Sequence, residues 1–139
     1  MTGNLQEMLK RHEGFRSKPY VDSVGKYTVG YGRNLDDKGI SVMEAEVMLK
    51  NDIAEAEEEA MRFPWYLKLN QTRRDVILDM LFNLGAYRFH GFKKMIAAIE
   101  QGDYEEAARQ MMDSKWAAQV GVRARELSHM FRTGEYDKG

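Results

Sequence analysis

Three residues near the N-terminus have the types and the spacing that a hydrolytic reaction requires: Glu13, Asp22 and Thr28. Glu13 is predicted to end a helix, Asp22 to lie on a strand or its turn, and Thr28 to lie on the next strand. Two carboxylates and a hydroxyl converge if the helix end and the strands face each other. Hydrolysis of a glycosidic bond needs one carboxylic acid that protonates the leaving oxygen and one carboxylate that activates water or attacks the sugar.

The predicted positions also give the two carboxylates different surroundings. The last carbonyls of a helix carry partial negative charge, which disfavours an ionised side chain at Glu13, whereas a solvated turn favours the charged form of Asp22. Glutamate near helix ends and aspartate in turns are nevertheless common in purely structural roles, and threonine is an ordinary strand residue. Spacing alone therefore leaves the catalytic and the structural interpretation open.

The elements that must position these residues follow from the apolar pattern. Leu5, Met8, Leu9 and His12 have the spacing of one helix face, and Gly14 predicts the end of that helix directly after Glu13. Strand-forming residues broken by glycine-containing turns then predict two or three short antiparallel strands across residues 18–40.

A long helix is predicted over residues 41–63. Ser41 and Glu44 have the spacing of a capping box at its start, and Pro64 ends it. The rest of the chain has helical periodicity, with glycines or capping residues between segments. The predicted helices cover residues 71–84, 92–101, 103–112, 114–116 and 122–132.

These elements predict an α+β fold that is mostly helical, in a single domain spanning residues 1–139. A small β lobe (18–40) is joined by the linking helix (41–63) to a helical lobe (64–139), on which residues 1–13 pack. One domain is also the expectation for a chain of 139 residues.

Composition excludes several classes of protein. The chain has no cysteine, which excludes a disulfide scaffold and cysteine-ligated metal sites, and its three histidines lack the spacing of metal ligands. A net charge of −1 and a pI of about 6.3 argue against a nucleic-acid binder. No apolar run is long enough for a membrane span, and the N-terminus lacks the apolar core of a signal peptide, so synthesis in the cytoplasm is expected.

A set of motifs in order along the chain resembles the phage-type lysozymes, the T-even phage endolysin and its relatives. His12-Glu13-Gly14 is followed by Asp22 after eight intervening residues, and by Thr28 after five more. The resemblance covers essentially the whole chain. Its further motifs are Tyr27-Thr28-Val29-Gly30-Tyr31-Gly32, Phe82-Asn83-Leu84-Gly85, Gly91-Phe92, Ser114-Lys115-Trp116, Arg123-Ala124-Arg125 and Phe131-Arg132-Thr133-Gly134.

The resemblance implies a lysozyme-like fold with a cleft between the lobes, and an N-acetylmuramidase of the endolysin type. Such an enzyme hydrolyses the β-1,4 bond between N-acetylmuramic acid and N-acetylglucosamine in peptidoglycan, typically with inversion at the anomeric carbon. Glu13 would be the general acid, Asp22 the carboxylate on the opposite face of the sugar, and Thr28 a holder of the attacking water. Arg123 matches the arginine that pairs with the catalytic glutamate, and no metal or organic cofactor is implied.

Substrate contacts also follow from the resemblance. Asn34, Phe82, Met95 and Gln110 fall at positions that contact sugar in the family, although Gln110 replaces an asparagine and Met95 a small polar residue. The expected partner is the peptidoglycan glycan strand, bound by a monomer that a pore-forming holin releases from the host cytoplasm to the cell wall. Two alternatives remain: a lysozyme-fold module that binds glycan or protein without cleavage, and a chitinase-like glycosidase.

Overall fold

The computed structural model describes residues 2–136 and divides the chain into two compact units, Met1–Met48 and Leu49–Gly139. The predicted α+β class is confirmed, because helices dominate and the strands form one small antiparallel sheet. Whether residues 1–13 pack on the helical lobe stays a prediction.

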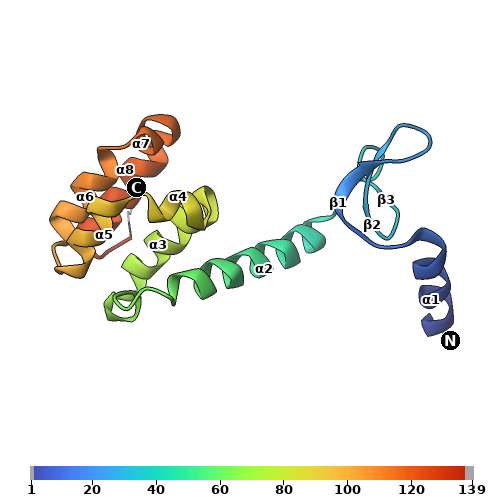
Figure 1. Ribbon diagram of the computed structural model, residues 1–139, viewed down its shortest axis with the longest axis horizontal. Coiled ribbons are helices and arrows are strands. Elements are labelled where there is room, and N and C mark those ends of the chain that lie inside the picture. Colours follow the sequence, from blue (N-terminus) through green and yellow to red (C-terminus); the bar gives the residue numbers. More distant parts are fainter. Residues whose placement is uncertain (1, 137–139) are drawn as a thin grey trace. The chain divides into compact units, whose positions relative to one another are not determined.

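The first unit contains helix α1, the sheet and the first turns of the helix that begins at Val42 (Figure 1). Helix α1 spans Thr2–Glu13, so Glu13 is its last residue as predicted. Gly14 ends the helix with a φ of +70°, and its N–H donates to the carbonyl of Lys10 at 2.9 Å. A residue without a Cβ atom adopts this left-handed conformation without steric cost, which explains the sharp stop after Glu13.

The sheet has three strands in the order β1-β2-β3, with β1 at Arg16–Val21, β2 at Tyr27–Gly30 and β3 at Arg33–Asn34. It begins two residues before the predicted start at 18. The first residues of β1 are exposed and carry no apolar alternation that would mark a strand. Pro19 lies at the irregular part of the β1–β2 pairing, on an edge strand, where a missing N–H donor is tolerated.

Helix α2 spans Val42–Ala60, and the predicted capping box at its start is confirmed. The Glu44 N–H donates to the Ser41 hydroxyl at 3.1 Å, and the Ser41 N–H donates to Oε1 of Glu44 at 2.8 Å. Arg33 of β3 also donates to Glu44, at 3.0 Å and 2.5 Å, and to the carbonyl of Gly39 at 2.9 Å. The Glu44 carboxylate thus joins the end of the sheet to the start of α2.

The second unit consists of helices (Figure 1). A short 3-10 helix at Tyr66–Lys68 precedes the first of them. The helices are α3 (Gln71–Leu84), α4 (Ala86–His90), α5 (Lys93–Glu100), α6 (Tyr104–Met112), α7 (Lys115–Val120) and α8 (Val122–Thr133).

Capping residues and glycines in the sequence predicted most of the ends of these helices. Gly85 ends α3, Asp103 caps α6 and Ser114 caps α7, as predicted. Two predicted helix ends need correction, and one helix was missed. Helix α2 ends at Ala60 and not at 63, α7 continues through Ala117 and Ala118 to Val120, and α4 was not predicted. A single helical turn such as α4 is too short to show a periodic pattern, and alanine favours extension of α7.

The buried core of the described residues lies in the second unit, between Ala56 and Phe131. Of the apolar stripe on α2, only Ala56 and Ala60 are buried. Arg73 of α3 anchors the end of α8, because its guanidinium donates to the carbonyl of Phe131 at 2.6 Å and to that of Arg132 at 3.1 Å. Helices α3 and α8 are also joined by an ion pair between Asp79 of α3 and Arg123 of α8.

The hydrogen bonds of Glu44 with Arg33 and Ser41 predict that the stability of the fold depends on pH. The Arg33 hydrogen bonds, followed by that from the Ser41 backbone, lower the pKa of Glu44 to about 2. A carboxylate with a lowered pKa in the folded state stabilises the fold above its ordinary pKa of about 4.5, and this contribution is lost as the pH falls towards 2. We therefore expect the difference in unfolding free energy between wild type and Glu44→Gln to shrink steadily between pH 5 and pH 2.

Urea denaturation of both proteins across that range, monitored by amide exchange at residues 33–44, measures the effect. Glu46→Gln is the matched control, because Glu46 is an exposed glutamate on the same helix that forms no ion pair with a described residue. A wild-type minus Glu44→Gln difference that stays constant with pH would contradict the assignment.

Candidate active site

Glu13 lies at the exposed C-terminal end of α1, where its side chain packs against Gly32. A Cβ atom built on Gly32 would lie 2.9 Å from Cδ of Glu13 and 3.2 Å from its Cγ, and closer still to Oε2. Gly32 also has a φ of +75°, which favours glycine. The loop between β2 and β3 therefore lies directly against the Glu13 carboxylate. The end of α1 and the sheet are in contact at this point.

Asp22 follows β1 and organises the turn that leads to β2. Its Oδ1 atom accepts the N–H groups of Val24 at 3.0 Å and Lys26 at 2.9 Å. Its backbone N–H donates to the carbonyl of Lys26 at 2.9 Å. Among the described residues, no donor is bonded to the second oxygen, Oδ2. One oxygen of Asp22 thus shapes the turn, and the other is available for a proton or a water molecule.

Thr28 is the central residue of the sheet and is only 3% exposed. Its hydroxyl donates to the carbonyl of Lys26 at 3.0 Å, so its oxygen lone pairs are left to accept a hydrogen bond. Thr28 pairs with Tyr20 on β1 and with Asn34 on β3. Residues directly opposite each other in an antiparallel sheet point to the same face, so Asn34 shares the face of Thr28.

The Asn34 side chain is already bonded within its own turn. Its amide nitrogen donates to Asp37 at 3.1 Å, and its carbonyl accepts the Asp37 N–H at 3.0 Å. Lys26 forms an ion pair with the other oxygen of Asp37 at 3.2 Å, and this hydrogen bond raises the pKa of Lys26. A fixed amide and a cation therefore lie on either side of Asp37, beside the strand that carries Thr28.

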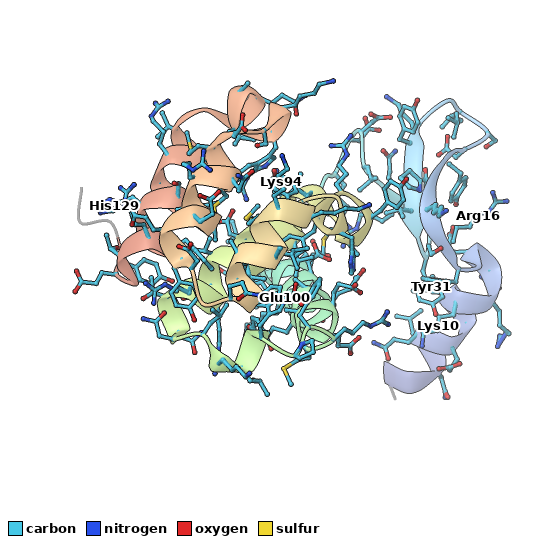
Figure 2. The ribbon with its side chains drawn as sticks, turned by 60° about the vertical axis from the view of Figure 1, so that its left-hand side comes forward. Lys10, Arg16, Tyr31, Lys94, Glu100 and His129 are labelled. Carbon is cyan, nitrogen blue, oxygen red and sulfur yellow. The ribbon has the colours of Figure 1, made fainter. Side chains whose placement is uncertain are left out.

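Aromatic residues and a lysine brace the loop that Glu13 contacts. The rings of Phe15 and Tyr31 are 5.3 Å apart, and the ammonium group of Lys10 lies 5.6 Å from the centre of the Tyr31 ring (Figure 2). Tyr31 directly precedes Gly32, so these contacts stabilise the backbone against which the Glu13 carboxylate packs. Sequence reasoning included Gly32 only as part of a motif, and its contact with Glu13 was not predicted.

Arg123 belongs to the second unit, where it forms an ion pair with Asp79. Both Nε and Nη2 of its guanidinium lie 2.8 Å from Oδ1 of Asp79. Arg123 is on α8 and Asp79 on α3, the two helices that Arg73 ties together. Asp79 was not predicted, because the pair is 44 residues apart in the sequence. The pairing of Arg123 with Glu13 stays a prediction.

The three other predicted sugar contacts also lie in the second unit. Met95 and Gln110 line the same cavity, although Met95 is only 1% exposed. Phe82 is 47% exposed and lines two other hollows, one with Glu55 and Glu59 and one with Arg123. The structure thus groups Met95 with Gln110 and places Phe82 apart from them.

Within residues 2–136, no group of three or more histidine, aspartate and glutamate side chains is arranged to hold a metal ion. Over the same residues, no helix has the length and apolar character of a membrane span. The first unit carries two carboxylates and a hydroxyl, which are groups able to donate a proton and to activate water.

The chain is similar in sequence to known phage lysozymes and endolysins. The family model for phage lysozyme matches residues 10–131, which includes all the site residues above. A probable T4-type lysozyme of Dictyostelium discoideum is 27% identical, with 96% of each chain covered. An endolysin of Acyrthosiphon pisum secondary endosymbiont phage 1 is 29% identical over 94% of this chain and 90% of its own, and the endolysin of Salmonella phage P22 is 32% identical over 72% and 73%.

The close approach of Gly32 to Glu13 predicts a context-dependent cost of substitution. Gly32→Ala places a Cβ atom against the carboxylate and forces alanine into a left-handed conformation. We expect a loss of about 1–2 kcal/mol for the backbone and a further loss of about 1–3 kcal/mol for the overlap. Gly39→Ala is the control, because Gly39 has a φ of +63° but a Cβ atom there would make only an ordinary contact, at 4.0 Å from the Leu35 carbonyl oxygen.

Urea unfolding of six proteins measures the two costs separately: wild type and Glu13→Ala, each alone, with Gly32→Ala and with Gly39→Ala. Gly32→Ala should cost more than Gly39→Ala in the wild-type background, and the same as Gly39→Ala once Glu13 is replaced by alanine. Equal costs of the two glycine substitutions in both backgrounds would show that the Glu13 side chain does not pack against Gly32.

Proposed function

The chain belongs to the phage lysozyme family and is a glycoside hydrolase that acts on peptidoglycan, and we propose that it cleaves the β-1,4 bond between N-acetylmuramic acid and N-acetylglucosamine. The observation that carries the proposal is the arrangement of the first unit. The Glu13 carboxylate packs against the loop that follows β2. Asp22 directly follows β1, in the turn that leads to β2, and Thr28 lies within β2.

In this proposal Glu13 is the general acid. It donates its proton to the oxygen that links the two sugars, and the bond between that oxygen and the anomeric carbon breaks. A water molecule forms the new bond to the same carbon from the opposite face and passes a proton to Asp22. Single displacement by water inverts the anomeric configuration and requires carboxylates about 6.5–9.5 Å apart.

The hydrogen bonds of the first unit support this division of roles. The free oxygen of Asp22 can accept the proton, because the bonds that shape the turn use only Oδ1. The Thr28 hydroxyl donates to Lys26 and can therefore accept a hydrogen bond from the attacking water. Arg123 acts as support for the general acid, and Asn34, Phe82, Met95 and Gln110 contact the glycan strand.

Replacing Glu13 or Asp22 by its amide should slow turnover strongly without unfolding the protein. We expect Glu13→Gln and Asp22→Asn each to lower the rate of peptidoglycan hydrolysis by a factor of about 10²–10⁴. Asp22→Asn keeps an oxygen that accepts the Val24 and Lys26 N–H groups, so the turn is retained. Glu7→Gln, an exposed change on the same helix as Glu13, should leave the rate unchanged. A folded variant of Glu13 or Asp22 with an undiminished rate would remove that residue from the mechanism.

The products identify the bond and the stereochemistry. We expect mass spectrometry of digested, purified peptidoglycan to show new reducing ends on N-acetylmuramic acid, and NMR in the first minutes to show the α anomer. Reducing ends on N-acetylglucosamine would indicate a chitinase-like specificity instead. Absence of products would indicate a module that binds glycan or protein without cleavage.

A further inference from the structure

The side chain of Asn34 is held in one orientation by Asp37, three residues along the chain. Its amide nitrogen donates to Oδ2 of Asp37 at 3.1 Å, and its carbonyl oxygen accepts the Asp37 N–H at 3.0 Å. With the amide reversed, its carbonyl would face the Asp37 carboxylate and its nitrogen would face the Asp37 N–H, so neither bond could form. Asp37 therefore fixes the direction of both ends of the amide.

The backbone of Asn34 is fixed as well. Asn34 pairs with Thr28 across the sheet, and the neighbouring Leu35 N–H donates to the Tyr27 carbonyl at 2.7 Å. The backbone carbonyl of Asn34 accepts the Lys38 N–H at 3.1 Å. Since residues directly opposite each other share a face of an antiparallel sheet, the fixed amide lies on the face that carries Thr28.

Asp37 is held in turn by the cation of Lys26. The ammonium group of Lys26 lies 3.2 Å from Oδ1 of Asp37, the oxygen that does not accept from Asn34. Lys26 is also the residue whose backbone N–H donates to Asp22 and whose carbonyl accepts from Thr28. The Asn34 amide is thus joined, through Asp37, to the segment that fixes the proposed base.

Each end of the Asn34 amide keeps one hydrogen-bonding position. A primary amide has two N–H groups and two carbonyl lone pairs, and the bonds with Asp37 use one of each. Among the described residues, no other group is bonded to the Asn34 side chain. Asn34 is only half-buried, so a ligand can reach the N–H group and the lone pair that remain.

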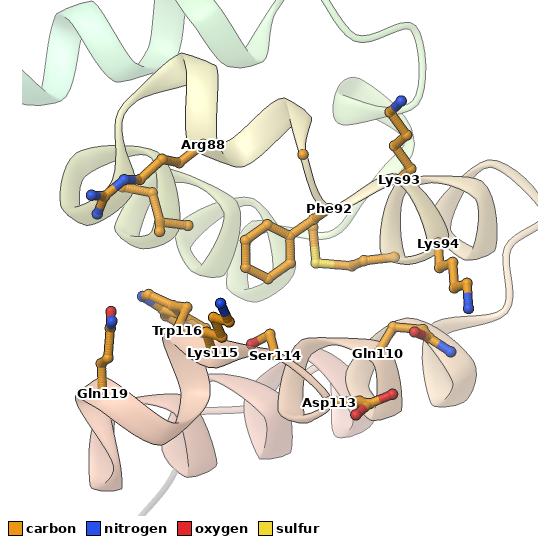
Figure 3. A pocket seen from close by; sticks show the side chains of 13 residues that line it. Arg88, Phe92, Lys93, Lys94, Gln110, Asp113, Ser114, Lys115, Trp116 and Gln119 are labelled. Atoms are coloured by element: carbon orange, nitrogen blue, oxygen red, sulfur yellow. The ribbon is translucent and has the colours of Figure 1, made fainter.

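Gln110, the other amide among the predicted sugar contacts, is held at one end only. It lines a cavity of the second unit, near Lys94 (Figure 3). Its nitrogen donates to Glu106 at 2.7 Å, and no donor among the described residues is bonded to its side-chain carbonyl. A donor and an acceptor in fixed directions are therefore a property of Asn34 and not of both predicted amide contacts.

A fixed donor beside a fixed acceptor fits the acetamido group, which both sugars of the proposed substrate carry. The N–H of that group donates a hydrogen bond and its carbonyl accepts one, so a single substituent can satisfy both remaining positions of Asn34. A hydroxyl at the same carbon would replace only one of the two bonds. A protonated amine, which is left when the acetyl group is removed, can donate but cannot accept, and it leaves the remaining Asn34 N–H unpaired.

We propose that Asn34 recognises the acetamido group of a substrate sugar, and that Asp37 is the positioning residue that orients the Asn34 amide for it. The inference rests on the proposed function, which supplies the glycan strand as the substrate. It adds the chemical group that this contact selects, and it adds a residue, Asp37, that acts on the sugar only through Asn34.

The test compares two forms of one peptidoglycan sample that differ only in the acetyl groups of the sugars. Acetic anhydride first blocks every free amine, and a glycan deacetylase then exposes the sugar amines of one portion. The wild type should have the higher kcat/KM on the acetylated form, and Asn34→Ala should lower this preference by about tenfold, the size of two net hydrogen bonds. Because Asn34→Ala keeps the charge of the wild type, a general effect of the amine charge would leave the preference unchanged.

Asp37→Ala tests the positioning role. It should lower the preference by about three- to tenfold, because the carboxylate no longer holds the amide, and it should lower it no further in a chain that already carries Asn34→Ala. A general loss of folding would lower kcat/KM on both forms equally and would leave their ratio unchanged.

Asp36→Asn is the matched control. It removes one negative charge from the same turn, and the asparagine oxygen can still accept the Tyr27 N–H that Asp36 accepts at 2.7 Å. This control should keep the wild-type preference. An unchanged preference in Asn34→Ala or in Asp37→Ala, or a control that loses the preference as fully as Asp37→Ala, would overturn the proposal.

A binding measurement separates this inference from the proposed function. Glu13→Gln in the full chain is titrated with the tetramer of N-acetylglucosamine and with the fully deacetylated tetramer, and the Asn34 side-chain amide is followed by NMR. The acetylated tetramer should bind about tenfold more tightly and shift that resonance. If the wild type cleaves no strand but this difference is found, the proposed function fails and the recognition by Asn34 stands. If the wild type cleaves the strand but the two tetramers bind equally or not at all, the recognition fails and the proposed function stands.

Discussion

The first unit depends on one close approach, that of the Gly32 backbone to the Glu13 carboxylate. Any side chain at position 32 would occupy the space of the carboxylate. The end of α1 therefore fits against the β2–β3 loop only while position 32 carries no side chain. Gly14 fixes where the helix stops, and Gly32 fixes what the last side chain meets. Two glycines with positive φ values thus determine the position of the proposed acid.

Asp22 and Thr28 share a second feature: each uses part of its hydrogen-bonding capacity for structure and keeps part free. Asp22 uses Oδ1 to shape its turn, and Thr28 uses its proton to bind the Lys26 carbonyl. The Lys26 backbone therefore fixes both side chains, by its N–H for one and by its carbonyl for the other. Groups fixed in this way need no reorganisation when charge moves between them, which favours proton transfer.

The sequence predicted what is local and missed what is not. Capping at Ser41 with Glu44, at Asp103 and at Ser114 depends on residues three positions apart, and those helix starts were predicted correctly. The contact of Glu13 with Gly32 and the ion pair of Arg123 with Asp79 join distant segments, and no periodic pattern signals them. The sequence predicted the types and order of the candidate catalytic residues. It did not predict the residues from distant segments that contact them.

A chain with a net charge of −1 has little general attraction for an anionic cell wall. The groups proposed for proton transfer lie within residues 1–48, and the other predicted contacts of the second unit lie within residues 49–139. Substitutions of the second group leave the hydrogen bonds that fix Asp22 and Thr28 in place, because those bonds are made inside the first unit. Residues that recognise the substrate can therefore change without disturbing the turn that carries the proposed base.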